Sequence, residues 1–210
     1  MQILDRTLPE LAAKARRLAA GPRRILGITG PPGSGKSTLA GALAAELGPD
    51  LAVVVSMDGF HLANHVLEDL GMRNRKGAPE TFDDAGYAAL LRRLRCQAEP
   101  VVYAPDFRRE LEEPVGSAVP VRREVPLVIT EGNYLLLESG AWPQAREQLD
   151  TVWFLALGDT ERVRRLQERH AAFGKSPSDA LKWALGSDQA NAELVAAHAG
   201  RADAVVRLRG

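Results

Sequence analysis

Residues 30–37 read GPPGSGKS and combine a glycine-rich turn, a lysine and a hydroxyl side chain at fixed spacing. Gly33 and Gly35 permit backbone conformations and a close approach that a Cβ atom would hinder. Successive amides in such a turn face one anion, and the following helix points its positive end at the same place. Lys36 adds a cation, and Ser37 adds an oxygen ligand for a metal ion. The pattern predicts a P-loop that binds a nucleoside triphosphate.

The context of the motif agrees with this interpretation, because an apolar strand precedes it and a helical segment follows it. We expect Lys36 to reach the β- and γ-phosphates of ATP and Ser37 to bind Mg²⁺. The chain contains no N-K-x-D motif for guanine and no S-G-G-Q signature of a transporter ATPase. The predicted nucleotide-binding residues in this motif are Gly30, Pro31, Pro32, Gly33, Ser34, Gly35, Lys36, Ser37 and Thr38.

Two acids follow apolar strands. The stretch 53–56 (VVVS) leads to Asp58, and the stretch 125–130 (VPLVIT) leads to Glu131. A carboxylate near the terminal phosphate can orient a substrate hydroxyl and accept its proton, which is the role we expect for Asp58. A second Mg²⁺ ligand or a turn former are the alternatives. Glu131 is expected to hold Mg²⁺ or its water, because hard cations prefer oxygen ligands; a helix cap or solvated strand end is the alternative.

Three arginines, Arg162, Arg165 and Arg169, recur at i, i+3 and i+7 and therefore share one helical stripe. Guanidinium groups match phosphate oxygens and stabilise the charge of phosphoryl transfer. A solvated face paired with acids of the same helix is the alternative. Beside a P-loop, the pattern predicts a lid at about 159–178, with Arg165 and Arg169 as its phosphate-binding residues and Lys175 as a candidate second cation.

Positioning these side chains requires a sheet. Continuously apolar strands alternate with helices, which indicates an α/β fold whose parallel sheet is covered on both faces. Ligands of such folds bind at the carboxyl ends of the strands. We predict strands at 24–29, 51–56, 125–130, 150–157 and 204–208, helices at 36–47, 83–97, 159–172 and 177–199, an N-terminal packing helix, and a β-ribbon near 101–121. Asp159 is the predicted cap of its helix, and the polar segment 61–80 is predicted to be irregular.

Composition narrows the function classes. Lys plus Arg and Asp plus Glu both total 27, so the neutral chain lacks the basic excess of a general nucleic-acid binder. No apolar run is long enough for a membrane span, and we see no signal peptide. The single Cys96 is expected to be a packing residue in a reducing, cytoplasmic environment. A monomer and a homodimer are both compatible with the sequence.

With these residues placed, the chain resembles the P-loop kinase superfamily of uridine kinase, phosphoribulokinase and pantothenate kinase. The motifs that carry the resemblance are GPPGSGKST, MDGFH, VYAPDFRRE, ITEGNYLL, the arginine-bearing segment and ADAVVRLRG. SMDGFHLAN, RKGAPETFD and RHAAFGKSP are also similar to a bacterial subgroup of nucleoside/nucleotide kinase-like proteins, or fructose-transport-system kinases. The resemblance covers nearly the whole chain. It implies a P-loop NTPase three-layer fold in a single kinase domain, 1–210, with ATP and Mg²⁺ as cofactors.

The resemblance also implies residue roles. Asp58 matches the catalytic aspartate, Glu131 the acid on the Mg²⁺ side, and Arg169 with Arg165 the lid. Tyr103 and Arg109 match ribbon positions that border the acceptor pocket, and Tyr134 falls in a family motif as a further substrate-binding residue. Asn191 is placed near adenine by the family pattern alone.

The acceptor-side loop is expected at about 60–82. Within it, Arg75 and Lys76 either bind an acidic or phosphorylated substrate or solvate the loop, and His61 could hydrogen-bond a substrate hydroxyl. The chain has DGFH where uridine kinases usually carry a DSFY-like turn, and it lacks much of the additional sequence of pantothenate kinase. Neither substrate is therefore carried over from the resemblance.

These observations predict an ATP- and Mg²⁺-dependent kinase that phosphorylates a hydroxyl of a small polar metabolite. A sugar such as fructose is the first choice, and pantothenate or a nucleoside is the second. A P-loop regulatory ATPase or nucleotide-binding switch without a small-molecule acceptor is the alternative from another class.

Overall fold

A six-stranded parallel sheet, in the order β1-β8-β7-β2-β6-β3, forms the centre of the molecule. The computed structural model describes residues 2–174 and 176–209. The P-loop strand β2 lies between β7 and β6, so loops at its carboxyl end can meet residues from both neighbours. The strands of this sheet are β1 (Gln2–Arg6), β2 (Arg24–Thr29), β3 (Ala52–Ser56), β6 (Leu127–Gly132), β7 (Thr151–Leu155) and β8 (Ala204–Leu208).

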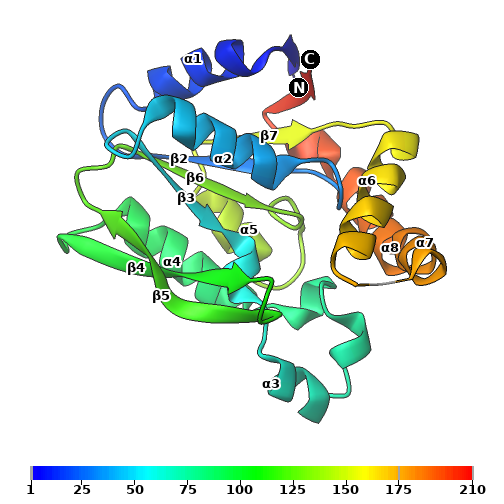
Figure 1. Ribbon diagram of the computed structural model, residues 1–210. Helices are drawn as coiled ribbons and strands as arrows, with labels where there is room; N and C mark the ends of the chain where they lie inside the picture. The colour runs from blue at the N-terminus through cyan, green and yellow to red at the C-terminus, as the bar shows by residue number, and fades with distance from the viewer. Residues whose placement is uncertain (1, 175, 210) are drawn as a thin grey trace.

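Helices cover both faces of the sheet, as Figure 1 shows. The helices α1 (Leu8–Leu18) and α2 (Lys36–Leu47) pack on one face, and α4 (Asp84–Arg95) and α5 (Trp142–Glu147) pack on the other. Neighbouring residues of one strand supply the two cores: Ile25 belongs to the cluster beneath α4 and α5, and Leu26 to the cluster beneath α1 and α2. Burial on both faces is why these strands read as unbroken apolar runs.

A two-stranded antiparallel ribbon of β4 (Val101–Arg108) and β5 (Glu113–Arg122) stands apart from the main sheet. Its register shifts between Ala104 and Asp106. The ribbon packs against the 3₁₀ turn η1 (Met57–Phe60), which follows β3. A Cβ atom at Gly59 would lie 2.6 Å from the Pro105 carbonyl oxygen, so glycine is what allows this approach.

Three helices lie at the carboxyl end of the sheet (Figure 1): α6 (Asp159–Ala172), α7 (Pro177–Leu185) and α8 (Ser187–Ala197). The remaining helical elements are α3 (Asn64–Asp69) and the 3₁₀ turns η2 (Arg73–Arg75), η3 (Pro79–Thr81) and η4 (Ala199–Arg201). In the part of the chain that the structure describes, every helix is too short or too polar to cross a bilayer.

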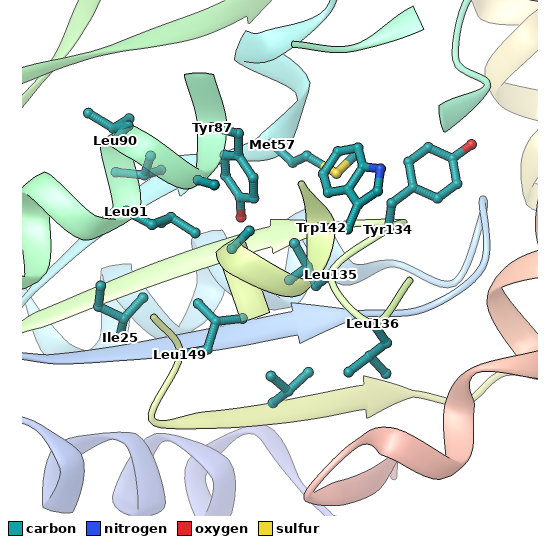
Figure 2. Packing of buried hydrophobic residues seen from close by; sticks show 14 of the residues in the cluster. Ile25, Met57, Tyr87, Leu90, Leu91, Tyr134, Leu135, Leu136, Trp142 and Leu149 are labelled. Atoms are coloured by element: carbon teal, nitrogen blue, oxygen red, sulfur yellow. The ribbon is translucent and has the colours of Figure 1, made fainter. Parts of the chain in front are cut away.

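An aromatic cluster under α4 and α5 supports the strands that end at the two acids. Figure 2 shows Tyr134 beside Trp142, and their ring centroids are 5.7 Å apart. The buried Tyr87 hydroxyl lies 2.7 Å from the Thr130 hydroxyl, which donates to the Val55 carbonyl at 2.6 Å. This chain of hydrogen bonds ties α4 to β6 and β6 to β3, because each buried polar atom needs a partner.

The predicted parallel α/β fold, its strands, its main helices and its ribbon are confirmed. Strand β1 was missed, because an exposed five-residue edge strand carries little periodicity. The segment predicted to be irregular contains the short helix α3. Gly158 is the N-cap of α6, and Asp159 is its first helical residue. Cys96 follows the last residue of α4, and its side chain is exposed. The predicted packing role of Cys96 is therefore wrong.

The contact at Gly59 yields a stability prediction. Gly59→Ala should lower the free energy of unfolding by about 1–3 kcal/mol, because the added methyl group must displace the backbone of the ribbon. Urea unfolding of the purified variant measures this change. Gly116→Ala is the matched control in the same ribbon, since a Cβ atom there meets nothing within 4 Å. Equal unfolding curves for the two variants would contradict the proposed close packing.

Candidate active site

A cleft of about 270 Å³ opens where β3 and β6 end and α2 begins. Ser37 lines it from the P-loop, Asp58 from the turn after β3, and Glu131 from β6. Arg109 closes it from the ribbon. Residues that lie far apart in sequence are therefore brought to one place. The full lining consists of Ser37, Gly41, Val54, Ser56, Asp58, Asp106, Phe107, Arg109 and Glu131.

The P-loop has the conformation that its glycines permit. Gly33 and Gly35 have φ angles of +82° and +93°, which residues with a Cβ rarely adopt. The amide of Ser34 donates to the Pro31 carbonyl at 3.1 Å, which tightens the turn. The buried Ser34 hydroxyl has no hydrogen-bond partner within residues 2–174 and 176–209. A phosphate oxygen at this turn would supply that partner, so the cradle fits its predicted ligand.

Lys36 lies close enough to the two carboxylates of the cleft for their charges to act on its ammonium group. Burial lowers the pKa of its ammonium group, and the charges of Glu131 and Asp58 oppose that shift. The cation is therefore stabilised by acids from two different strand ends.

Glu131 is the buried acid of the site, with 3% of its surface exposed. The Ser56 hydroxyl donates to its Oε1 atom at 2.7 Å. Burial raises the pKa of Glu131, the negative charge of Asp58 raises it further, and Lys36 lowers it. A carboxylate that is expensive to ionise in the apo protein is well suited to a cation, which would favour its charged form.

The donor atoms of the cleft fit Mg²⁺. The Ser37 hydroxyl and the carboxylates of Glu131 and Asp58 are hard oxygen donors that line the same cleft. Among the residues that the structure describes, no three His, Cys, Asp or Glu side chains are grouped to hold a metal ion on their own. Mg²⁺ usually takes only one or two carboxylates and completes its shell with phosphates and water, so this sparse set is suitable.

Asp58 lies in the turn η1, two residues beyond the end of β3. Its backbone amide donates to the Ser56 hydroxyl oxygen at 3.1 Å, and this bond stabilises the turn. Its Oδ2 atom is 3.4 Å from Nη2 of Arg109. The Nδ1 atom of His61 donates to the Asp58 carbonyl at 2.7 Å. Burial lowers the pKa of His61, so the ring is neutral at pH 7 and supports the turn instead of lining the cleft.

Helix α6 packs directly on the P-loop. A Cβ atom at Gly33 would lie 2.8 Å from the Arg162 carbonyl oxygen, and one at Gly35 would lie 3.3 Å from Nη1 of Arg165. Arg165 therefore reaches the phosphate cradle. The side chain of Arg162 is fully buried, where Nε donates to Asp159 at 3.0 Å.

Arg169 lies close enough to the cleft for its charge to act on Lys36. Burial lowers the pKa of Arg169, and Asp188 and Asp58 oppose that shift. The structure thus brings both predicted lid arginines toward the P-loop. Lys175, the candidate second cation, lies outside the described residues.

A second cavity, of about 810 Å³, lies on the other side of the P-loop. Thr38 contributes to it, as do apolar side chains from both ends of the chain, among them Leu8 and Leu208. Asn191, predicted near adenine, does not line this cavity; its Nδ2 donates to the Gly77 carbonyl at 3.4 Å. Sequence reasoning missed Leu8, Arg207 and Leu208, since only the β1–β8 pairing brings the chain ends to the P-loop.

The other predicted substrate-binding residues lie away from the cleft lining. Arg75 forms an ion pair with Glu80, and Tyr103 is 57% exposed on β4. Lys76 donates to Asn64 and to the Glu112 carbonyl, and the buried Tyr134 hydroxyl donates to the Gly77 carbonyl. Of this predicted set, Arg109 alone is among the lining residues. Asp106 also lines the cleft and was not predicted from the sequence. It lies beside the register shift of the ribbon, which the sequence did not reveal.

The chain is similar to several known proteins. The family described as ATPase family associated with various cellular activities (AAA) matches residues 26–91, which contain the P-loop. The Schizosaccharomyces pombe protein C227.14, provisionally named a uridine kinase, is 32% identical over 174 residues, covering 79% of this chain and 74% of that protein. The uncharacterized Escherichia coli protein YggC is 34% identical over 190 residues, covering 89% of this chain and 78% of YggC.

A solved structure shows the same fold over almost the whole length. The Silicibacter sp. TM1040 protein, provisionally described as a fructose transport system kinase, is 37% identical and superposes with a TM-score of 0.85. The alignment covers 95% of this chain and 98% of that protein.

The burial of Glu131 predicts a conflict between stability and function. Because the pKa of Glu131 is raised in the folded protein, this side chain contributes most to stability below about pH 4.3, its pKa in the unfolded chain. The contribution is lost as the pH rises through the pKa of the folded state. Glu131→Gln should therefore raise the free energy of unfolding of the apo protein at pH 7 by about 0.5–2 kcal/mol. The gain should shrink toward pH 4.5.

Urea unfolding without Mg²⁺ or nucleotide, at several pH values, measures this difference. The exposed Glu68→Gln is the matched control and should leave stability unchanged at every pH. A destabilised Glu131→Gln at pH 7 would show that the ionised carboxylate stabilises the fold.

Proposed function

We propose that this chain, which belongs to the P-loop kinases of the uridine kinase-like family, phosphorylates a small polyhydroxylated metabolite, first of all a sugar such as fructose. It is an ATP-dependent small-molecule kinase. The observation that carries the proposal is the cleft in which Asp58 stands beside Ser37 and Glu131. A carboxylate there has room beside it for an alcohol.

The lining of the cleft supports a neutral acceptor. Asp58, Glu131 and Asp106 contribute three carboxylates to the lining, and Arg109 contributes one guanidinium. Carboxylates accept hydrogen bonds from hydroxyl groups and repel a second anion. The ring of Phe107 offers an apolar surface for the carbon face of a sugar. The description of the Silicibacter protein supports a sugar, and that of the S. pombe protein supports a nucleoside as the second choice. Pantothenate is a further candidate.

The proposed chemistry assigns a task to each side chain. Asp58 orients the acceptor hydroxyl and accepts its proton as the oxygen attacks the γ-phosphorus, and Arg109 holds the carboxylate in place. Lys36, Arg165 and Arg169 stabilise the charge on the transferred phosphoryl group. Ser37 and Glu131 would hold Mg²⁺, which neutralises charge on the β- and γ-phosphates when bound.

The apolar cavity beside Thr38 supports a purine site at that place. Leu8, Leu157 and Leu208 offer flat apolar contact, and the guanidinium of Arg207 can stack on an aromatic ring. This assignment replaces the expected contact of Asn191 with adenine.

Asp58→Asn tests the general base. The amide keeps the shape of the side chain but cannot accept the proton, so kcat should fall by about 10²–10⁴-fold while ATP affinity stays near normal. Acceptor-dependent ADP release and nucleotide titration measure the two quantities. Asp69→Asn, on the exposed end of α3, is the control and should keep full activity. Near-normal turnover of Asp58→Asn would remove the base assignment.

A panel of sugars, pantothenate and nucleosides tests the acceptor. ADP release should rise with at least one polyhydroxylated compound, and a sugar should be the best, because the carboxylates of the cleft need hydroxyl donors. A response to pantothenate or a nucleoside alone would contradict the sugar. ATP hydrolysis that ignores every metabolite would support a regulatory ATPase.

A further inference from the structure

The carbonyl of Gly77 is a meeting point of three parts of the molecule. The Tyr134 hydroxyl, from the segment after β6, donates to it, and so does Nδ2 of Asn191, from α8, at 3.4 Å. The amide of Gly77 donates to the Thr81 hydroxyl oxygen at 2.9 Å. Gly77 has a φ angle of +100°, so the chain can turn here to present its carbonyl to both donors.

On one side, hydrogen bonds connect the residue before Gly77 to the ribbon turn that borders the acceptor cleft. Lys76, the residue before Gly77, donates to Oδ1 of Asn64 at 2.6 Å and to the carbonyl of Glu112. Glu112 has a φ angle of +54°, an unfavourable conformation for a residue with a Cβ, and the bonds to its carbonyl help to hold it. Glu112 belongs to the same ribbon turn as Arg109, whose guanidinium contacts Asp58.

On the other side, the junction continues into the helices that carry the arginines. Asn191 lies less than one helical turn from Asp188 on α8. Nε2 of His170 lies 2.7 Å from Asp188 Oδ2, and Nη2 of Arg169 lies 4.0 Å from Asp188 Oδ1. The position of α8 therefore bears on Arg169 directly and on Gly77 through Asn191.

We propose that the Gly77 carbonyl couples the arginine-bearing helices to the acceptor-side loop, with Asn191 and Lys76 as positioning residues. Nucleotide that draws Arg165 and Arg169 onto its phosphates fixes α6 and α8. The hydrogen bond from Asn191 then restricts the motion of Gly77. The hydrogen bonds of Lys76 restrict in turn the ribbon turn that contains Arg109. ATP binding thereby prepares the acceptor cleft before any acceptor enters. The inference rests on the proposed site, but it goes beyond the assignment of the acceptor.

Hydrogen exchange with the non-hydrolysable analogue AMP-PNP and Mg²⁺ tests this coupling without an acceptor. In the native protein, the analogue should slow exchange in the P-loop, in α6 and in residues 76–81. In Asn191→Ala, the protection of 76–81 should fall by about two- to tenfold, the range that one hydrogen bond contributes, while P-loop protection remains.

Asn191→Asp separates the hydrogen bond from packing. The carboxylate has the shape of the amide but cannot donate to a carbonyl, so this variant should lose the nucleotide-dependent protection as Asn191→Ala does. Ala190→Ser, at the neighbouring exposed position of α8, should behave as the native protein does.

Two results would overturn the coupling while leaving the kinase assignment intact. One is native protein in which the analogue protects the P-loop and α6 but not 76–81. The other is Asn191→Asp with native protection of that loop. If the analogue protected neither the P-loop nor the loop, the nucleotide site itself would be wrong, and the coupling would be overturned with it.

Discussion

The site depends on the electrostatic interaction between the Lys36 ammonium and two carboxylates, Glu131 and Asp58. Burial lowers the pKa of Lys36, and the negative charges of Glu131 and Asp58 oppose this shift. The same proximity is costly for Glu131, whose pKa is raised by burial and by Asp58. The three groups are therefore balanced for a ligand that brings its own anions and cation. A nucleotide with a bound metal ion matches that requirement.

The spacing of these charges is set by strand register. Parallel pairing places Ser56 of β3 opposite Glu131 of β6, and a hydrogen bond of 2.7 Å joins their side chains. Asp58 follows two residues later in a turn that the Ser56 hydroxyl also supports. Slipping β3 by one residue would turn its buried side chains to the other face and remove this bond. The hydrophobic core thus fixes the electrostatics of the cleft.

Local sequence features predicted the parts of this site that are local in the chain. Each of these parts is recognisable within a short stretch of sequence: the P-loop, the apolar strands and the arginine stripe of α6. Their structure and approximate placement could therefore be predicted. The partners of Lys76, Asn191 and Tyr134 could not, because each contact joins segments far apart in sequence. Lys76 illustrates the difficulty: its charge was compatible with a substrate contact or with a solvated loop, yet its ammonium donates to Asn64 and to a backbone carbonyl.

The glycines of the P-loop also make room for helix α6, in addition to the phosphate groups. A Cβ atom at Gly33 would lie 2.8 Å from Cγ of Leu166 and from the Arg162 carbonyl oxygen, both on α6. The absence of that atom lets α6 rest on the cradle, which brings Arg165 to Gly35. Phosphate access and the seating of the helix thus impose the same requirement on one residue. Because the two demands coincide, the contact at Gly33 places α6, and with it Arg165, beside the P-loop without a separate structural element.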